Sequence, residues 1–211
     1  MSEPRFQRRK EDRPAEITEA ALAAFAEKGY AATRVDDVAK RAGVSKGLLY
    51  LYFKTKEDLF KAVIRSFVEP RITDLSTSLD ESELGAEAFI RGPFLSFIKS
   101  LPNSPIRIVF RLMISEGHKH PDLTAYYWSN VVTRGLAMLR KLVARGVANG
   151  EFKKTAVDDF PQLLISPVLF SIFWKTLFEK YDPLDSDRFM ETHIDTLLAY
   201  IKLDPKAGDP S

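Results

Sequence analysis

Apolar residues recur three and four positions apart along most of the chain, which is the spacing of one face of an α-helix. The first such stretch is residues 13–28, in which Ile17, Ala21 and Phe25 fall at i, i+4 and i+8. Gly29 follows as the residue that ends this helix. No stretch alternates apolar and polar residues for long enough to form a strand. The pattern predicts an all-α protein.

Two short helices follow at once, and each has its own start signal. Thr33 and Asp36 form a T-x-x-D variant of the capping box, which predicts a second helix that ends at Gly43. Ser45 can cap a third helix over residues 46–53, because its hydroxyl can accept a hydrogen bond from a backbone N–H of the first turn. The interval between these two helices has room only for a tight turn.

A longer helix is expected next. Thr55 and Asp58 form another T-x-x-D start for residues 56–68, and Pro70 should end or kink that helix. Further helices are expected over residues 83–101, with a kink at Gly92 and Pro93, and over 105–117, 122–148, 158–181 and 187–202.

Residues 38–52 have the spacing of a helix-turn-helix motif. Ala39 supplies a small residue where two helices approach, and Gly43 tolerates the positive φ of a tight turn. An ordinary corner between two helices uses the same packing, but in a helix-turn-helix the exposed face of the second helix enters the major groove of DNA. The inward positions hold Val38, Ala42, Val44, Leu49 and Tyr52, and the exposed face holds Ser45, Lys46, Gly47, Leu48, Tyr50 and Leu51.

The stretch TRVDDVAKRAGVSKGLLYLYFKTKEDL at residues 33–59 resembles the signature of the tetracycline-repressor (TetR) family of bacterial transcription regulators. It keeps a small residue and Gly-Val at the turn, a glycine in the second helix, paired aromatics before Phe53, and Lys-x-x-Leu at the next helix start. The resemblance implies a nine-helix protein, in which three N-terminal helices bind DNA and the other six form a ligand-binding and dimerisation domain. We accordingly expect a basic arm at 1–12, a DNA-binding domain at 13–55, a ligand-binding and dimerisation domain at 56–204 and a C-terminal tail at 205–211.

The resemblance also assigns roles around the second helix of the motif. Lys46 is a long cation that can reach guanine O6 and N7 or a phosphate, and Leu48 can contact a thymine methyl. Leu51 either shares that face or packs against the start of the next helix. The N-termini of helices at Thr33 and Lys56 point unsatisfied N–H groups at anions. Base edges are assigned to Lys46, Gly47 and Leu48, phosphates to Thr33, Tyr50, Tyr52 and Lys56, and Ser45 completes the DNA-binding set.

The sequence LLISPVLFSIFWKTLFEKY at residues 163–181 is apolar on nearly every side. A helix without a polar face in a water-soluble protein must be covered on two sides. The TetR resemblance implies that one side pairs with the last helix across a two-fold axis, which makes a homodimer and places two reading helices about one DNA turn apart. The expected interface residues are Val168, Ile172, Phe189, His193, Leu197, Tyr200 and Ile201.

The other side of the same helix is expected to line a pocket for a small-molecule effector, apolar or aromatic. Aromatic side chains at helical spacing form plain core more often than a ligand pocket, so both interpretations stay open. Arg107 and Arg111 lie on one helix face, where they either meet an anionic ligand or remain surface charges. The candidate pocket residues are Phe94, Phe97, Phe110, Met113, His118, Tyr127, Trp128, Phe170 and Trp174.

Composition excludes several other classes of protein. The chain has 211 residues and no cysteine, so it has no disulfide and no thiolate metal site. Its longest apolar run, residues 163–174, is too short to cross a bilayer. Glu116, His118 and His120 are close in sequence but lack a second cluster, so we expect no metal and no cofactor. We expect a cytoplasmic protein without a membrane partner.

Charge adds little by itself, because 31 Lys and Arg against 29 Asp and Glu leave a net charge of only +2. The arginines of the arm either solubilise it or follow DNA phosphates. The sequence has no nucleophile with its base, phosphate loop or dinucleotide fingerprint, so we expect no enzyme. We interpret the chain as a DNA-binding transcriptional regulator, a repressor released from double-stranded operator DNA by a small ligand. The alternative is an all-helical ligand-binding or enzymatic protein whose N-terminal corner is only structural.

Overall fold

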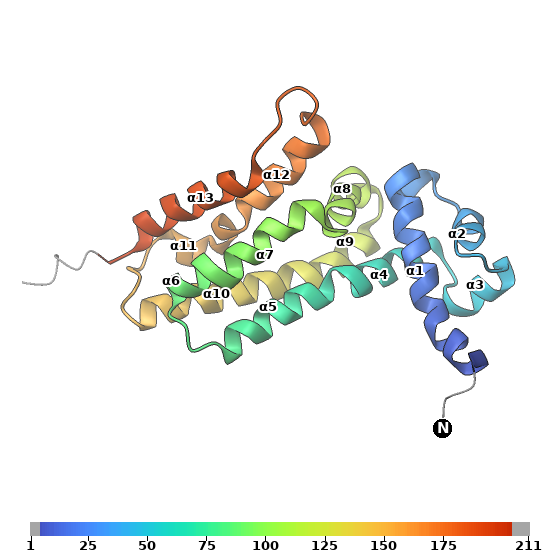
Figure 1. The fold of residues 1–211 in the computed structure, drawn as a ribbon, viewed down its shortest axis with the longest axis horizontal. Coiled ribbons are helices and arrows are strands. Elements are labelled where there is room, and N and C mark those ends of the chain that lie inside the picture. Colours follow the sequence, from blue (N-terminus) through green and yellow to red (C-terminus); the bar gives the residue numbers. More distant parts are fainter. Residues whose placement is uncertain (1–4, 204–211) are drawn as a thin grey trace, which may run out of the picture. The chain divides into compact units, whose positions relative to one another are not determined.

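The computed structural model describes the backbone of residues 5–203 and the side chains from residue 13 onward (Figure 1). Residues 1–4 of the expected arm and the expected tail at 205–211 lie outside the described residues, as do the side chains of residues 5–12. The described chain is helical throughout its regular elements, with one isolated bridge between Phe152 and Lys202. The expected all-α fold is confirmed.

The helical elements follow one another closely along the chain. The first four are α1 (Arg5–Ala32), α2 (Val35–Arg41), α3 (Lys46–Tyr52) and α4 (Lys56–Phe67). The next are α5 (Glu69–Glu81), α6 (Ala86–Phe89), η1 (Ile90–Phe94), α7 (Leu95–Ser100), η2 (Leu101–Asn103), α8 (Ile106–Glu116) and η3 (Gly117–Lys119). The last are α9 (Pro121–Tyr127), η4 (Trp128–Val132), α10 (Thr133–Ala148), α11 (Ala156–Asp159), η5 (Pro161–Leu164), α12 (Ser166–Leu177) and α13 (Ser186–Ile201).

The elements gather into two compact units, which we describe separately. One unit takes in the chain up to Pro70 together with Ile108–Ser129, and the other takes in Arg71–Arg107 together with the chain from Asn130 onward. The segment 108–129, which carries most of α8 and all of α9, therefore groups with the N-terminal helices rather than with the rest of the expected ligand-binding domain.

Local sequence signals explain how the N-terminal helices begin and end. Gly29 interrupts α1 with φ 78°, a left-handed conformation that glycine adopts without strain, so the expected helix end is confirmed. Ser45 Oγ accepts a hydrogen bond from Leu48 N at 3.1 Å, and Thr55 forms the expected capping box with Asp58.

The expected start of the second helix is wrong by one residue. Arg34 is the residue before α2, and its backbone N–H donates to Asp37 Oδ2 at 3.1 Å, so the reciprocal partner is Asp37 rather than Asp36. The hydroxyl of Thr33 donates instead to the carbonyl oxygens of Gly29 and Ala24, at 2.6 and 3.2 Å. Thr33 is therefore bonded to the end of α1 and leaves the next position to begin α2.

Prolines explain where the later helices differ from expectation. No helix was expected over residues 69–81, but Pro70 lies in the first turn of α5, where its missing N–H costs nothing, so a new helix begins there. The expected helix at 83–101 is divided by the π-helical segment η1, which includes Gly92 and Pro93. The single helix expected at 158–181 is wrong: α11, η5 and α12 replace it, with Pro161 starting η5 and Pro167 in the first turn of α12.

The core of the first unit forms where α1 packs against α2 and α4, and where α4 packs against α9. Phe25, Tyr30 and Phe60 make a ring cluster, with centroids 5.4 to 5.6 Å apart. Leu49 of α3 is fully buried, which ties the short third helix to this core. The N-terminal helices thus rest on a compact apolar base.

The second unit is held together by long-range contacts around the α10–α11 turn. The carboxylate of Glu151 accepts hydrogen bonds from the backbone N–H groups of Ala86 and Glu87, at 2.8 and 2.9 Å, and so caps α6. Gly146 makes room for the buried ring of Phe152, since a Cβ at that position would lie 2.0 Å from it. Burial opposes ionisation of Glu151, but the two backbone hydrogen bonds and one from Asn149 hold the pKa of this carboxyl below its usual value.

Candidate functional site

The turn between α2 and α3 has the geometry that the sequence predicts. Gly43 occupies the left-handed region with φ 65°, directly after α2 and its cap. Ala39 and Val38 are buried beneath the turn, and Leu49 is buried on the α3 side. Ala42 and Val44, expected to point inward, are half-buried at its edge.

The outer face of α3 is exposed along its length. Lys46, Gly47 and Tyr50 are exposed, and Leu48 and Tyr52 are half-buried. Leu51 is 79% exposed, so it does not pack against α4, and the packing interpretation of this residue is wrong. An apolar side chain held in solvent near the C-terminal end of α3 is suited to a contact with a thymine methyl.

Lys46 forms an ion pair across the turn. Its Nζ lies 2.7 and 3.0 Å from the two carboxylate oxygens of Asp36, which stands on the first turn of α2. The same Nζ lies 6.0 Å from the centroid of the Tyr50 ring. The hydrogen bond and charge of Asp36 raise the pKa of Lys46, so the ammonium is charged at neutral pH. From the sequence, Asp36 was expected to cap the second helix, and this ion pair was not expected.

The side chains of Thr33 and Lys56, at the helix starts whose backbone N–H groups were expected to meet phosphates, are bonded within the protein. Thr33 is buried, with its hydroxyl bonded to the end of α1. Lys56 donates from Nζ to the carbonyl oxygens of Tyr30 and Ala31, at 2.8 and 3.1 Å, and lies 4.5 Å from the Tyr30 ring centroid. Burial lowers the pKa of Lys56, and the charge of Glu116 opposes that shift. Both side chains donate to carbonyl oxygens at the end of α1, where it is interrupted at Gly29, and Lys56 thereby ties α4 to α1.

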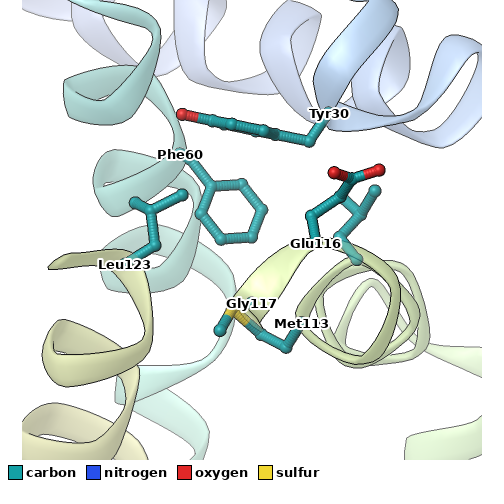
Figure 2. Close-up of a pocket in the computed structure, with 7 residues that line it drawn as sticks. Tyr30, Phe60, Met113, Glu116, Gly117 and Leu123 are labelled. Carbon is teal, nitrogen blue, oxygen red and sulfur yellow. The ribbon is translucent and has the colours of Figure 1, made fainter. Parts of the chain in front are cut away.

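A narrow internal space lies beneath this junction in the first unit (Figure 2). The space has no room for a water molecule. Its lining residues come from α1, α4, α8, η3 and α9, and Figure 2 shows the Phe60 ring between the Tyr30 ring and Met113. The lining residues are Tyr30, Phe60, Leu112, Met113, Glu116, Gly117 and Leu123.

The expected ligand residues do not form one group within either unit. Phe110, Met113, His118, Tyr127 and Trp128 belong to the first unit, and Met113 is the one that lines the narrow space. His118 is exposed and Trp128 is 55% exposed, whereas burial raises the pKa of Tyr127 to about 12. In the second unit, Phe94 is fully buried and Phe97 half-buried.

The two faces of α12 are the reverse of those expected. Val168 and Ile172, expected at the dimer interface, are 2% exposed within the protomer. Phe170, expected in the pocket, is 42% exposed, and its ring contacts those of Trp174 and Phe189 at 5.6 and 5.3 Å. The outward face of α12 is apolar as well, so the spacing of apolar residues could not distinguish the buried face from the exposed one.

The last helix divides in the same way. Leu197 and Ile201 are buried in the protomer, so they are core residues and not the interface residues that the sequence predicts. Phe189 and His193 are half-buried, and Tyr200 is exposed. The exposed apolar face of α12 and its following turn, which we call the aromatic face, consists of Leu169, Phe170, Phe173, Leu177, Phe178 and Tyr181.

Other candidate chemistry resolves into ordinary structural contacts. Arg111 donates to the carbonyl oxygen of Ala26 at 2.7 Å, and the His120 ring meets the Tyr30 ring at 4.8 Å. In residues 13–203, no three His, Asp or Glu side chains come together in a way that would hold a metal ion. None of the helices in residues 5–203 combines the length and apolarity needed to span a bilayer.

The sequence matches two family patterns. The sequence pattern of bacterial regulatory proteins of the tetR family matches residues 17–63. That of the C-terminal domain of AefR-like transcriptional repressors matches residues 94–200, which is half of the chain. The chain belongs to the TetR family. It is a DNA-binding transcriptional regulator, and the function indicated by its helix-turn-helix is confirmed.

Sequence similarity to relatives within the TetR family extends beyond the DNA-binding helices. The fatty acid metabolism regulator protein of Bacillus subtilis is 31% identical over 144 residues, which are 66% of this chain and 70% of that one. The repressor KstR2 of Mycolicibacterium smegmatis is 28% identical over 141 residues, 65% of this chain and 66% of that protein. The regulator FadR from Bacillus subtilis, solved in complex with stearoyl-CoA, shares the fold with a TM-score of 0.74 at 21% identity, covering 88% of this chain and 97% of that one.

Proposed function

We propose that this TetR-family regulator is a homodimeric repressor that binds its operator through the outer face of α3 and releases it when a long-chain acyl ligand binds. The observation that carries the proposal is the 31% identity over 144 residues to the fatty acid metabolism regulator. A match of that length extends beyond residues 17–63, so the likeness includes part of the effector-binding region. The FadR complex with stearoyl-CoA supports an acyl thioester as the first ligand class to test.

The DNA contacts are assigned to the side chains that α3 exposes. Lys46 offers N–H donors and Leu51 an apolar tip, while Tyr50 offers a hydroxyl. Gly47 carries no side chain, so the backbone of α3 can approach the groove closely. Ser45, Leu48 and Tyr52 complete the proposed reading helix.

The homodimer is assigned to the aromatic face. A soluble monomer rarely leaves several large apolar side chains side by side in water, and such a patch marks an interaction surface. Phe178, just past the end of α12, continues the ring contacts of Phe170 and Trp174: its centroid lies 5.8 Å from that of Phe173 and 5.1 Å from that of Trp174. Two copies joined by this face in two-fold symmetry would present two copies of α3 to one duplex.

Ligand release tests the proposal directly. A duplex selected in vitro from a random library by the full-length protein serves as operator, and stearoyl-CoA is titrated into the complex. Allosteric coupling of ordinary size predicts that stearoyl-CoA weakens DNA binding by about 5- to 150-fold, while CoA alone leaves it unchanged. Operator affinity that is unaltered by saturating stearoyl-CoA would contradict the acyl ligand.

A further inference from the structure

We infer that Asp36 is a specificity-determining positioning residue: it fixes the ammonium of Lys46 at the reading face of α3 and keeps DNA phosphates from capturing it. The inference rests on the proposed function, because it deepens the account of the same DNA-binding face. The inference gives an acidic residue a role in reading DNA. A carboxylate is otherwise unexpected on a DNA-binding surface, because it repels the phosphates.

The geometry leaves the ammonium both held and available. Lys46 Nζ meets both carboxylate oxygens of Asp36, at 2.7 and 3.0 Å, so a single side chain of α2 fixes the direction of a flexible lysine on α3. An ammonium has three N–H donors, and two oxygens leave at least one for a base acceptor such as guanine O6 or N7. A lysine without such a partner would have many rotamers and no preferred base.

The exposure of the pair shows that it can respond to DNA. The side chains of Lys46 and Asp36 are 58% and 60% exposed. The attraction in an ion pair this exposed favours the paired form over the unpaired form by about fivefold at most. Such a pair contributes little to folding. Its energy is still comparable with one phosphate contact, so it can decide whether Lys46 reads a base or moves to the backbone of any sequence.

The neighbouring acid has a different function. Asp37, the next residue, accepts the capping hydrogen bond from Arg34 N and pairs with Lys28 at 3.1 Å. Those contacts lower the pKa of Asp37, with the Arg34 backbone bond as the larger cause and the Lys28 hydrogen bond next. Asp36 takes no part in that cap, so its substitution leaves the start of α2 intact.

The test measures sequence selectivity rather than binding alone. Wild type, Asp36→Asn and Asp122→Asn are titrated against the duplex selected by wild type and against a scrambled duplex of equal length, at several salt concentrations. Asp122 is an exposed acid on the first turn of α9, so its substitution gives the same charge change in a matched helical position. Thermal melting checks that each variant is folded.

Asp36→Asn should bind the scrambled duplex about threefold more tightly, with a salt slope steeper by about one unit, because the freed Lys46 gains a phosphate. The preference for the selected duplex should fall at least about threefold in Asp36→Asn and remain within about twofold of wild type in Asp122→Asn and Asp36→Glu. In a Lys46→Met background, the Asp36→Asn substitution should no longer change that preference.

Two results would overturn the inference. Affinity that rises by the same factor on both duplexes would mean that Asp36 only repels DNA, and unchanged preference and slope would mean that the pair has no role. A wild-type protein that prefers no duplex would contradict the proposed function itself. A selective wild type with an unaffected Asp36→Asn variant contradicts only the positioning role.

Discussion

Lys46 and Lys56 have the same side chain and adjoin the same motif, yet the fold uses them differently. Lys46 is exposed and paired with a single carboxylate, whereas Lys56 is half-buried and bonded to two carbonyl oxygens at the end of α1. From the sequence, both lysines were expected to meet DNA, Lys46 at base edges and Lys56 at phosphates, and the bonding of Lys56 within the fold was not expected. Their partners lie 10 and 25 to 26 residues away, and local spacing gives no information at that distance.

Features with short-range causes were predictable from the sequence. Gly43, Ser45 and Thr55 act through neighbours one to three positions away, and the structure confirms the positive φ and the two caps. Thr33 shows the limit of such local patterns. Its T-x-x-D spacing predicts a cap on the next helix, but its hydroxyl donates instead to the carbonyl oxygen of Gly29, where α1 is interrupted.

Substitution of Lys56 with Met should weaken folding without removing a DNA contact. The free energy of unfolding in urea should fall by about 1 to 3 kcal/mol, because two carbonyl oxygens lose a charged donor. The salt slope of DNA binding should equal that of wild type, because Lys56 is bonded to carbonyl oxygens and meets no phosphate. A Lys56→Met protein of unchanged stability and reduced slope would restore the phosphate role.

At the scale of elements, the sequence predicted the presence of helices better than it predicted which face of a helix is buried. Most helices occur where apolar periodicity placed them, and the exceptions are explained by Pro70, Pro161 and Pro167, which start new helical segments as readily as they end old ones. The faces of α12 were reversed because a helix that is apolar all round has no polar positions to orient it. The packing of α12 against α13, η2 and η5 distinguishes the two faces.

The cap of α6 by Glu151 should make the free energy of unfolding depend on pH. Because the folded pKa of Glu151 is lowered, its stabilisation is present above the ordinary glutamate pKa of about 4.3 and is lost as pH falls through the folded value. Glu151→Gln should lower the unfolding free energy by about 1 to 2 kcal/mol at pH 7. Urea titrations should show this difference shrinking towards pH 3.

Glu83→Gln supplies the control for that measurement, because Glu83 is exposed in the loop that leads to the same helix. It should leave the unfolding free energy and its pH dependence close to those of wild type. A Glu151→Gln deficit that stays constant from pH 7 to pH 3 would mean that the carboxylate charge is not what stabilises the α6 start.

At the scale of the whole molecule, the aromatic face predicts the assembly. Phe173→Glu places a charge among apolar side chains that the proposed dimer buries, at a cost of several kcal/mol. Sedimentation should therefore show monomers whose far-ultraviolet dichroism is unchanged. Leu84→Glu, another exposed apolar position in the same unit, should remain dimeric. A Phe173→Glu dimer as stable as wild type would place the interface elsewhere.

Sequence-selective binding by the outer face of α3 is the central claim, and Leu51 tests it most directly because its exposed side chain has no role in the core. Equilibrium titrations should compare wild type and Leu51→Ala on the selected duplex and on its scrambled form. Wild type should prefer the selected duplex by at least about 10³-fold. Leu51→Ala should lose about tenfold on that duplex alone, as expected for one lost base contact. Equal affinity of wild type for both duplexes, or a Leu51→Ala protein that retains full preference, would contradict the account.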